Sequence, residues 1–265
     1  MYEVMPLAAV CGLGAVVGSF LNVCILRLPE GKSILGPGSH CYGCSKPINW
    51  YDNIPVLSYL MLRGKCRYCH TRFSIQYLIV EVLTGLAFAL IVWRLGFGPR
   101  SLVYAVVTCA LIVQAGIDLK YRIIPDFITL PGIALGLVAS AVWPAALFGE
   151  TSWIGGLVTS AVGVLVGGGF LYVSAMAAEW VLKKEAMGGG DIKLLGMLGA
   201  FLGYRGSIWI IFVSSLIGSV VGVYLRVRKG EESIPFGPYL GIAAFLYMVF
   251  GTEVIGWYLR YAGWS

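Results

Sequence analysis

Long apolar stretches recur along this chain of 265 residues and limit the folds that are open to it. A sliding window of about 19 residues marks eight of them. They lie near residues 4–26, 78–95, 101–118, 127–148, 153–181, 191–205, 207–225 and 237–259. A helix needs about 20 apolar residues to cross the hydrocarbon core of a bilayer. We therefore expect an all-α integral membrane protein with about eight transmembrane helices.

The composition supports a membrane protein and excludes a soluble globular enzyme. Only 12% of the residues are charged, whereas about a quarter are charged in a typical soluble domain. Several glycines are spaced four apart, as in Gly14/Gly18 and Gly163/Gly167, and small residues at that spacing let helices approach closely in lipid. The net charge of +6 is spread over separate loops. We expect lipid and no nucleic acid as a partner.

The basic residues predict the orientation of the chain. With eight crossings, alternate loops face the same side, and all but four of the 19 basic residues then share one side. The exceptions are Arg94, Arg100, Arg205 and Arg260. Loops rich in Lys and Arg face the cytoplasm, so both termini are expected outside, in the plasma (inner) membrane. Only GYRG separates the sixth and seventh spans, and merging them would spoil this asymmetry.

A polar segment between the first two spans carries two C-x-x-C pairs. The chain thus divides into a first helix (1–26), a cytoplasmic loop (27–77) and a seven-helix core (78–265). Two such pairs at this spacing favour one structural zinc ion in a closed tetrahedral site, with the ligands Cys41, Cys44, Cys66 and Cys69. A pair of disulfides is the alternative, which a reducing compartment disfavours. His40 and His70 flank the pairs and could each replace a cysteine.

Acidic residues within the apolar spans are candidates for function, because charge inside a bilayer is costly. Asp118 closes the third span and Asp191 opens the sixth, so the alternation of spans puts both near the cytoplasmic face. Two carboxylates brought together away from water tend to share one proton. One then acts as a base and the other as an acid, which is the equipment for hydrolysing a peptide bond without a covalent intermediate.

Gly188, Gly189 and Gly190 precede Asp191 and would let backbone approach a substrate strand and adopt positive φ. Alternatively, these glycines end one helix and Asp191 caps the next. Asp126 follows a proline at the start of the fourth span, so helix capping is its favoured role.

Glu81 and Glu179 are further acids in or beside the spans. Glu81 lies about a turn inside the second span, where a function and a simple pairing with Arg72 or Lys65 are equally open. Glu179 is interpreted as an interfacial residue paired with loop bases.

Together, these motifs resemble the type IV prepilin peptidase family, the bifunctional membrane aspartyl enzymes that process pilin-like precursors. The resemblance covers nearly the whole chain in motif order: GSFLNVCILRLP, the four-cysteine loop, VEVLTG, IDLKYRIIPD and GGGDIKLL. Carried over residue by residue, the family's two catalytic aspartates fall on Asp118 and Asp191, the positions already selected by topology. Asp126 matches the family's Pro-Asp and is not its catalytic acid.

The resemblance implies two reactions on type IV prepilin or pseudopilin precursors. A short basic leader is cut off at the cytoplasmic face, typically after Gly and before a Phe-like residue, and S-adenosylmethionine then methylates the new N-terminal amine. The family's zinc loop is linked to methylation, which would place that site between the loop and the first spans. The candidate residues there are Asn22, Arg27, Lys65 and Glu81.

Two other classes of protein remain open at this stage. A proton-coupled transporter would use intramembrane carboxylates as relays, but the acids lie near one face and the hydropathy has no inverted repeat. A membrane scaffold would use the zinc loop to dock partners, and its aspartates would only cap helices.

Overall fold

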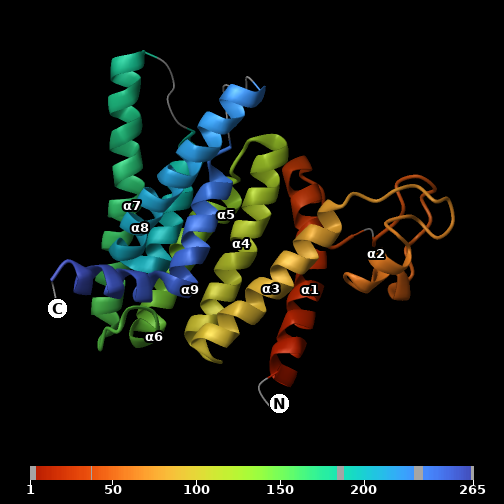
Figure 1. Cartoon of the computed structure of the whole chain (residues 1–265), viewed down its shortest axis with the longest axis horizontal. Coiled ribbons are helices and arrows are strands. Elements are labelled where there is room, and N and C mark those ends of the chain that lie inside the picture. Colours follow the sequence, from red (N-terminus) through yellow and green to blue (C-terminus); the bar gives the residue numbers. More distant parts are fainter. Residues whose placement is uncertain (1–3, 37, 184–187, 230–234, 264–265) are drawn as a thin grey trace. The chain divides into compact units, whose positions relative to one another are not determined.

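The computed structural model describes residues 4–36, 38–183, 188–229 and 235–263. Over these ranges the chain forms helices joined by turns, and β pairing is limited to two isolated bridges, His40 with Pro47 and Lys65 with Arg72. The expected all-α class is therefore confirmed. Figure 1 shows the order of the helices along the chain.

Six helices in the described ranges are long and apolar enough to cross a membrane. They are α1 (Val4–Arg27), α3 (Gln76–Leu95), α4 (Pro99–Tyr121), α7 (Trp153–Leu182), α8 (Gly189–Lys229) and α9 (Gly237–Tyr261). The loop after α1 holds three short helices: η1 (Leu28–Glu30), η2 (Trp50–Asn53) and α2 (Leu57–Met61). The expectation of an integral membrane protein is borne out, while the expected count of eight spans is not confirmed.

One difference from the expected count lies in the stretch at residues 127–148, which contains two helices instead of one. They are α5 (Asp126–Val142), with 17 residues, and the short α6 (Pro144–Phe148). Trp143 separates them with a φ of −127° and a ψ of 55°. A residue before proline is disfavoured in the helical region, so Pro144 accounts for the break.

The other difference lies in α8, which contains the predicted sixth and seventh spans in one element. Gly203, in the GYRG segment, has a φ of 68° and a ψ of −177° inside it. A Cβ built on Gly199 would lie 2.8 Å from the Ser207 hydroxyl oxygen. Eight residues of continuous helix would separate these positions by about 12 Å. The chain therefore folds back at Gly203, where glycine tolerates the left-handed φ.

The helices group into two compact units, Met1–Phe97 with Ala105–Ile117, and Gly98–Tyr104 with Asp118–Ser265. In the first unit, α1 crosses α3 (Figure 1). A Cβ on Gly14 would lie 2.8 Å from the Gly85 Cα, and a Cβ on Gly18 would lie 2.8 Å from the Glu81 Cα. The predicted role of these glycines in close helix approach is confirmed.

In the second unit, α5, α7 and α9 each pack against α8. At the α7–α8 contact, a Cβ on either Gly163 or Gly199 would overlap the carbonyl group of the other. Close by, the buried Ser160 hydroxyl donates a hydrogen bond of 2.6 Å to the Ala200 carbonyl oxygen. This packing fixes the start of α8, where Asp191 lies, relative to α5 and α7.

Candidate functional site

Asp118 lies near the C-terminal end of α4 and belongs to the second unit. Its side chain is buried, and its Oδ2 atom accepts a hydrogen bond of 3.0 Å from the backbone N–H of Gly237. Gly237 is the first residue of α9. A Cβ at Gly237 would lie 2.7 Å from the same oxygen, so this approach requires glycine.

Asp191 lies in the first turn of α8, in the same unit. Its Oδ1 atom is buried and has no hydrogen-bond partner among the described residues. Its carboxylate interacts electrostatically with that of Asp118. The structure thus brings the two predicted aspartates near enough for their charges to interact, with Asp118 buried and Asp191 half-buried.

Ile124 holds the backbones around this site together. A Cβ on Gly190 would lie 2.8 Å from the Ile124 Cβ, and a Cβ on Gly237 would lie 3.3 Å from its Cδ1. Neither Ile124 nor Gly237 was predicted as a site residue. The signal for Gly237 was a glycine directly before Pro238, since proline is common in the first turn of a helix.

In the glycine run before Asp191, Gly190 lets the backbone approach Ile124 closely. Gly189 and Gly190 are helical and begin α8, and the Asp191 N–H donates to the Gly188 carbonyl at 3.1 Å. Asp191 is the third residue of α8, so it does not occupy the capping position of the alternative interpretation. Gly190 allows contact with Ile124 that any side chain would obstruct.

Asp126 makes an ion pair in place of the favoured capping role. Pro125 occupies the capping position of α5, and the two Asp126 carboxylate oxygens lie 2.7 and 2.8 Å from Lys193 Nζ. Lys193 follows Asp191 by two residues. The pair therefore ties the start of α5 to the start of α8. Glu179, by contrast, is exposed in the last turn of α7.

The four loop cysteines form one cluster in the first unit. Their sulfur atoms all lie within 4.8 Å of one another, and Cys41 Sγ is 3.6 Å from Cys69 Sγ. Thiolates at 2.3 Å from a tetrahedral zinc ion would be about 3.8 Å apart. All seven cysteines are free, so the disulfide alternative is wrong, and the cluster could hold a metal ion. Neither flanking histidine belongs to the described cluster.

Local turns prepare these sulfurs to bind a metal. In each pair the N–H of the first cysteine donates a hydrogen bond to the carbonyl oxygen five residues further on. Cys41 donates to Lys46 and Cys66 donates to Thr71, both at 2.9 Å. The Thr71 side chain, by hydrogen bonding, lowers the pKa of Cys69 to about 6. Backbone N–H groups of Cys69 and Tyr68 lower the pKa of Cys66. Both effects favour the thiolate, the metal-binding form, at Cys66 and Cys69. A backbone hydrogen bond at Lys46 lowers the pKa of Cys44, but burial and the neighbouring cysteine side chains outweigh it and raise this pKa to about 11.

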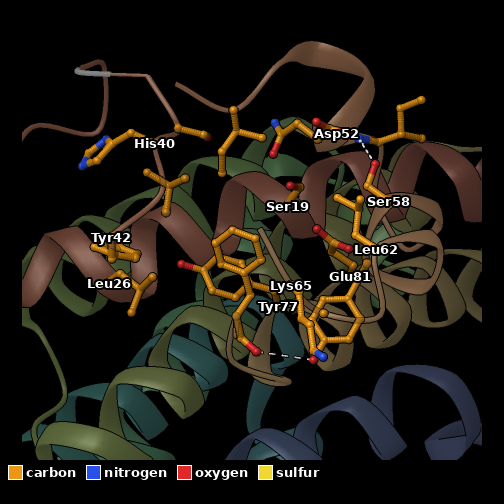
Figure 2. Close-up of a pocket in the computed structure, with 18 of the residues that line it drawn as sticks. Ser19, Leu26, His40, Tyr42, Asp52, Ser58, Leu62, Lys65, Tyr77 and Glu81 are labelled. Carbon is orange, nitrogen blue, oxygen red and sulfur yellow. Dashed lines mark hydrogen bonds between the residues drawn. The ribbon is translucent and has the colours of Figure 1, made fainter. Parts of the chain in front are cut away.

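A pocket of about 120 Å³, partly open to solvent, lies between the cysteine loop and the helices α1 and α3 (Figure 2). Three of the four methylation candidates line it: Arg27, Lys65 and Glu81. Asn22 does not line it; its side-chain amide donates to the Gly18 and Tyr77 carbonyl oxygens at 3.3 and 3.1 Å. Asn22 thereby joins α1 to α3.

Glu81 is the buried acid of this pocket. Its Oε2 atom accepts a hydrogen bond of 2.7 Å from the Val56 N–H, and its carboxylate also bonds the Ser19 side chain. These partners replace the expected pairing with Arg72 or Lys65. Figure 2 shows Ser19 and Glu81 with Lys65 and Tyr77 among the side chains that line the pocket. Ser19 and Tyr77 were not predicted.

Comparison with known proteins gives consistent matches along the chain. Residues 13–95 match the bacterial peptidase A24 N-terminal domain, and residues 105–223 match the type IV leader peptidase family. A prepilin leader peptidase/N-methyltransferase of Xanthomonas campestris pv. campestris is 40% identical over 96% of this chain and 95% of the relative. Proteins of the same name from Pseudomonas putida (38% identical over 91% and 90%) and Neisseria gonorrhoeae (35% over 97% and 95%) are also similar. No solved structure matches.

Proposed function

Because this chain belongs to the type IV leader peptidase family, we propose that it removes the leader of a type IV prepilin or pseudopilin and methylates the new N-terminal amine. The observation that carries the peptidase part is that Asp118 and Asp191 lie near enough for their charges to interact. No observation favours a transporter or a scaffold.

The two aspartates supply acid and base for peptide hydrolysis. The ionised carboxylate takes a proton from water, and the protonated one polarises the scissile carbonyl group. The unpartnered Oδ1 of Asp191 supports this proposal, because a buried polar atom without a partner is expected where substrate or water binds. The basic loops and the positive-inside rule support placing the site at the cytoplasmic side of the inner membrane.

Methylation belongs to the pocket between the cysteine loop and α1 and α3. S-adenosylmethionine would supply the methyl group there. The pocket offers cationic side chains, Arg27 and Lys65, for its carboxylate and an acidic one, Glu81, for its positively charged groups. Asn22 supports the pocket by holding α1 against α3.

Zinc is the metal that the four sulfurs fit best. Four thiolates fill a tetrahedral shell and leave no open position for water. A zinc ion held by Cys41, Cys44, Cys66 and Cys69 would therefore be structural, joining the two cysteine turns of the loop.

The experiment for the peptidase replaces each aspartate singly, as Asp118→Asn and Asp191→Asn. Each variant should lower cleavage of a co-expressed precursor by about 10²- to 10⁴-fold, because acid–base catalysis is lost. Mass spectrometry of the precursor's N-terminus reads cleavage and methylation together. The matched control is Glu179→Gln, since Glu179 is an exposed acid of the same unit. Normal processing by either aspartate variant would reject the mechanism.

A further inference from the structure

The first backbone N–H of α9, that of Gly237, donates a hydrogen bond to Asp118. The first four N–H groups of a helix have no acceptor within the helix, and here the Gly237 N–H points at Asp118 Oδ2 from 3.0 Å away. Both groups are buried, and the residues are 119 positions apart in sequence. The N-terminal end of a helix carries partial positive charge, so the 25-residue α9 favours a negative charge on this oxygen.

Asp191 has the opposite surroundings. Its Oδ1 atom is buried without a hydrogen-bond partner among the described residues, and the charge that acts on it is that of Asp118. Asp118 also interacts electrostatically with Arg122, one turn further along. Hydrogen-bond donors and cations stabilise a carboxylate, whereas a neighbouring anion stabilises the protonated acid.

We propose that the start of α9 fixes the proton arrangement of the pair, with Asp118 ionised and Asp191 protonated before substrate binds. The inference rests on the peptidase activity proposed above. Gly237 is then a positioning residue, which acts through Asp118. It must be glycine because a Cβ would lie 2.7 Å from the oxygen that accepts its N–H.

This arrangement assigns each proton in the reaction. Asp118 takes a proton from water as the water oxygen bonds to the scissile carbonyl carbon, and Asp191 gives its proton to the carbonyl oxygen. The resulting diol returns one hydroxyl proton to Asp191 as the carbon–nitrogen bond breaks, and the proton on Asp118 passes to the departing amine. The leader leaves with a new carboxyl group, and both aspartates regain their starting states.

The test compares Gly237→Ala with Gly256→Ala in the full-length protein in detergent. A Cβ at Gly256, in the same helix, would meet no atom within 4 Å. The probe is a precursor with a basic leader and a Gly–Phe junction. Gly237→Ala should lower kcat for cleavage by about tenfold or more and move the acidic limb of the pH profile up by about one unit. Gly256→Ala should match the unmodified protein.

Other charged groups near the pair bear on that pH profile. They are Arg122 directly after α4, Asp191 from α8 and the Asp126–Lys193 pair at the starts of α5 and α8, while Tyr239 is the first titratable side chain of α9. None of these is altered in either variant. A pH shift that occurs only in Gly237→Ala therefore reports the loss of the hydrogen bond from this amide to Asp118. An unshifted acidic limb would overturn the proposal even if kcat fell.

Methylation of a peptide that already carries a free N-terminal Phe separates the other outcomes. Gly237→Ala should keep this activity, because the methylation pocket lies in the first unit. If the unmodified protein neither cleaves nor methylates, the proposed function itself is rejected. If the unmodified protein cleaves but the acidic limb of the pH profile is the same in Gly237→Ala, only this inference is rejected.

Infrared spectra of the carboxyl groups test the proton assignment even if Gly237→Ala does not fold. At neutral pH the band of the protonated carboxyl group should disappear in Asp191→Asn, where Asp118 keeps the Gly237 N–H. In Asp118→Asn, which removes the neighbouring anion, Asp191 should still hold its proton to a higher pH than Asp118 does in Asp191→Asn, because its buried Oδ1 has no donor among the described residues. The reverse pattern would overturn the assignment.

Discussion

Lys193 follows Asp191 by two residues and holds the Asp126 carboxylate from the start of α5. The side chains are 39% and 56% exposed, and exposed ion pairs contribute only about 0.2–1 kcal/mol to stability. The pair therefore matters more for where α8 begins than for how stable the protein is.

Breaking this pair should reduce cleavage without unfolding the protein. Lys193→Met should lower kcat for cleavage by about tenfold, because a small displacement of Asp191 spoils its geometry. The exchange Asp126→Lys with Lys193→Asp should restore part of the rate. Kinetics with a purified precursor check both variants, and a thermal melt should change little. A doubly exchanged protein no faster than Lys193→Met would mean that the ion pair does not position Asp191.

Single residues also mark the limit of prediction from sequence. Asp118 and Asp191 could be selected because charge within apolar spans is rare and their spans place them at one depth. Gly237 and Ile124 could not, since the proline after Gly237 indicates only the start of a helix, and neither residue carries a chemical group that marks a site. Glu81 was selected, but its partners, the Val56 N–H and Ser19, depend on how the loop folds over α3.

Among the elements, the four-cysteine loop was the most predictable and the helix count the least. Two C-x-x-C pairs at metal-binding spacing predict a four-cysteine cluster from the sequence alone. Hydropathy locates apolar segments but is insensitive to backbone breaks, so it could not divide α5 from α6 at Trp143. The reversal at Gly203 falls in the short GYRG segment that separated two predicted spans.

Removing one sulfur from each turn of the loop should release the metal and damage one activity selectively. Cys41→Ser with Cys66→Ser should reduce bound zinc from about one ion per chain to a trace and abolish methylation, because the loop forms part of the methylation pocket. Cleavage should persist, since the aspartates belong to the other unit. Metal analysis and N-terminal mass spectrometry measure these effects.

Cys11→Ser with Cys109→Ser is the matched control, because these two cysteines lie outside the cluster. This control should retain zinc and both activities. Zinc retained at full occupancy by the Cys41/Cys66 variant would contradict the assigned ligands.

In the molecule as a whole, the two candidate sites belong to different compact units, the methylation pocket to one and the aspartates to the other. Either activity should therefore be removable while the other continues. The two family matches, to residues 13–95 and to residues 105–223, divide the chain in a similar way.

Glu81→Gln should separate the activities. Glutamine keeps an oxygen that can accept the Val56 N–H but removes the negative charge, so methylation should fall by about 10²-fold or more while cleavage stays normal. The co-expressed precursor should then appear in mass spectra with its leader removed and its N-terminus unmethylated. Glu179→Gln serves as the control. Fully methylated product from Glu81→Gln would exclude a role for this charge.

The bond between Asp118 and Gly237 also bears on when the enzyme becomes active as it is made. A ribosome adds α9 after both aspartates have been synthesised, and until then Asp118 cannot accept the Gly237 N–H. The growing chain therefore enters the bilayer with an incomplete proteolytic centre, and insertion of α9 completes it.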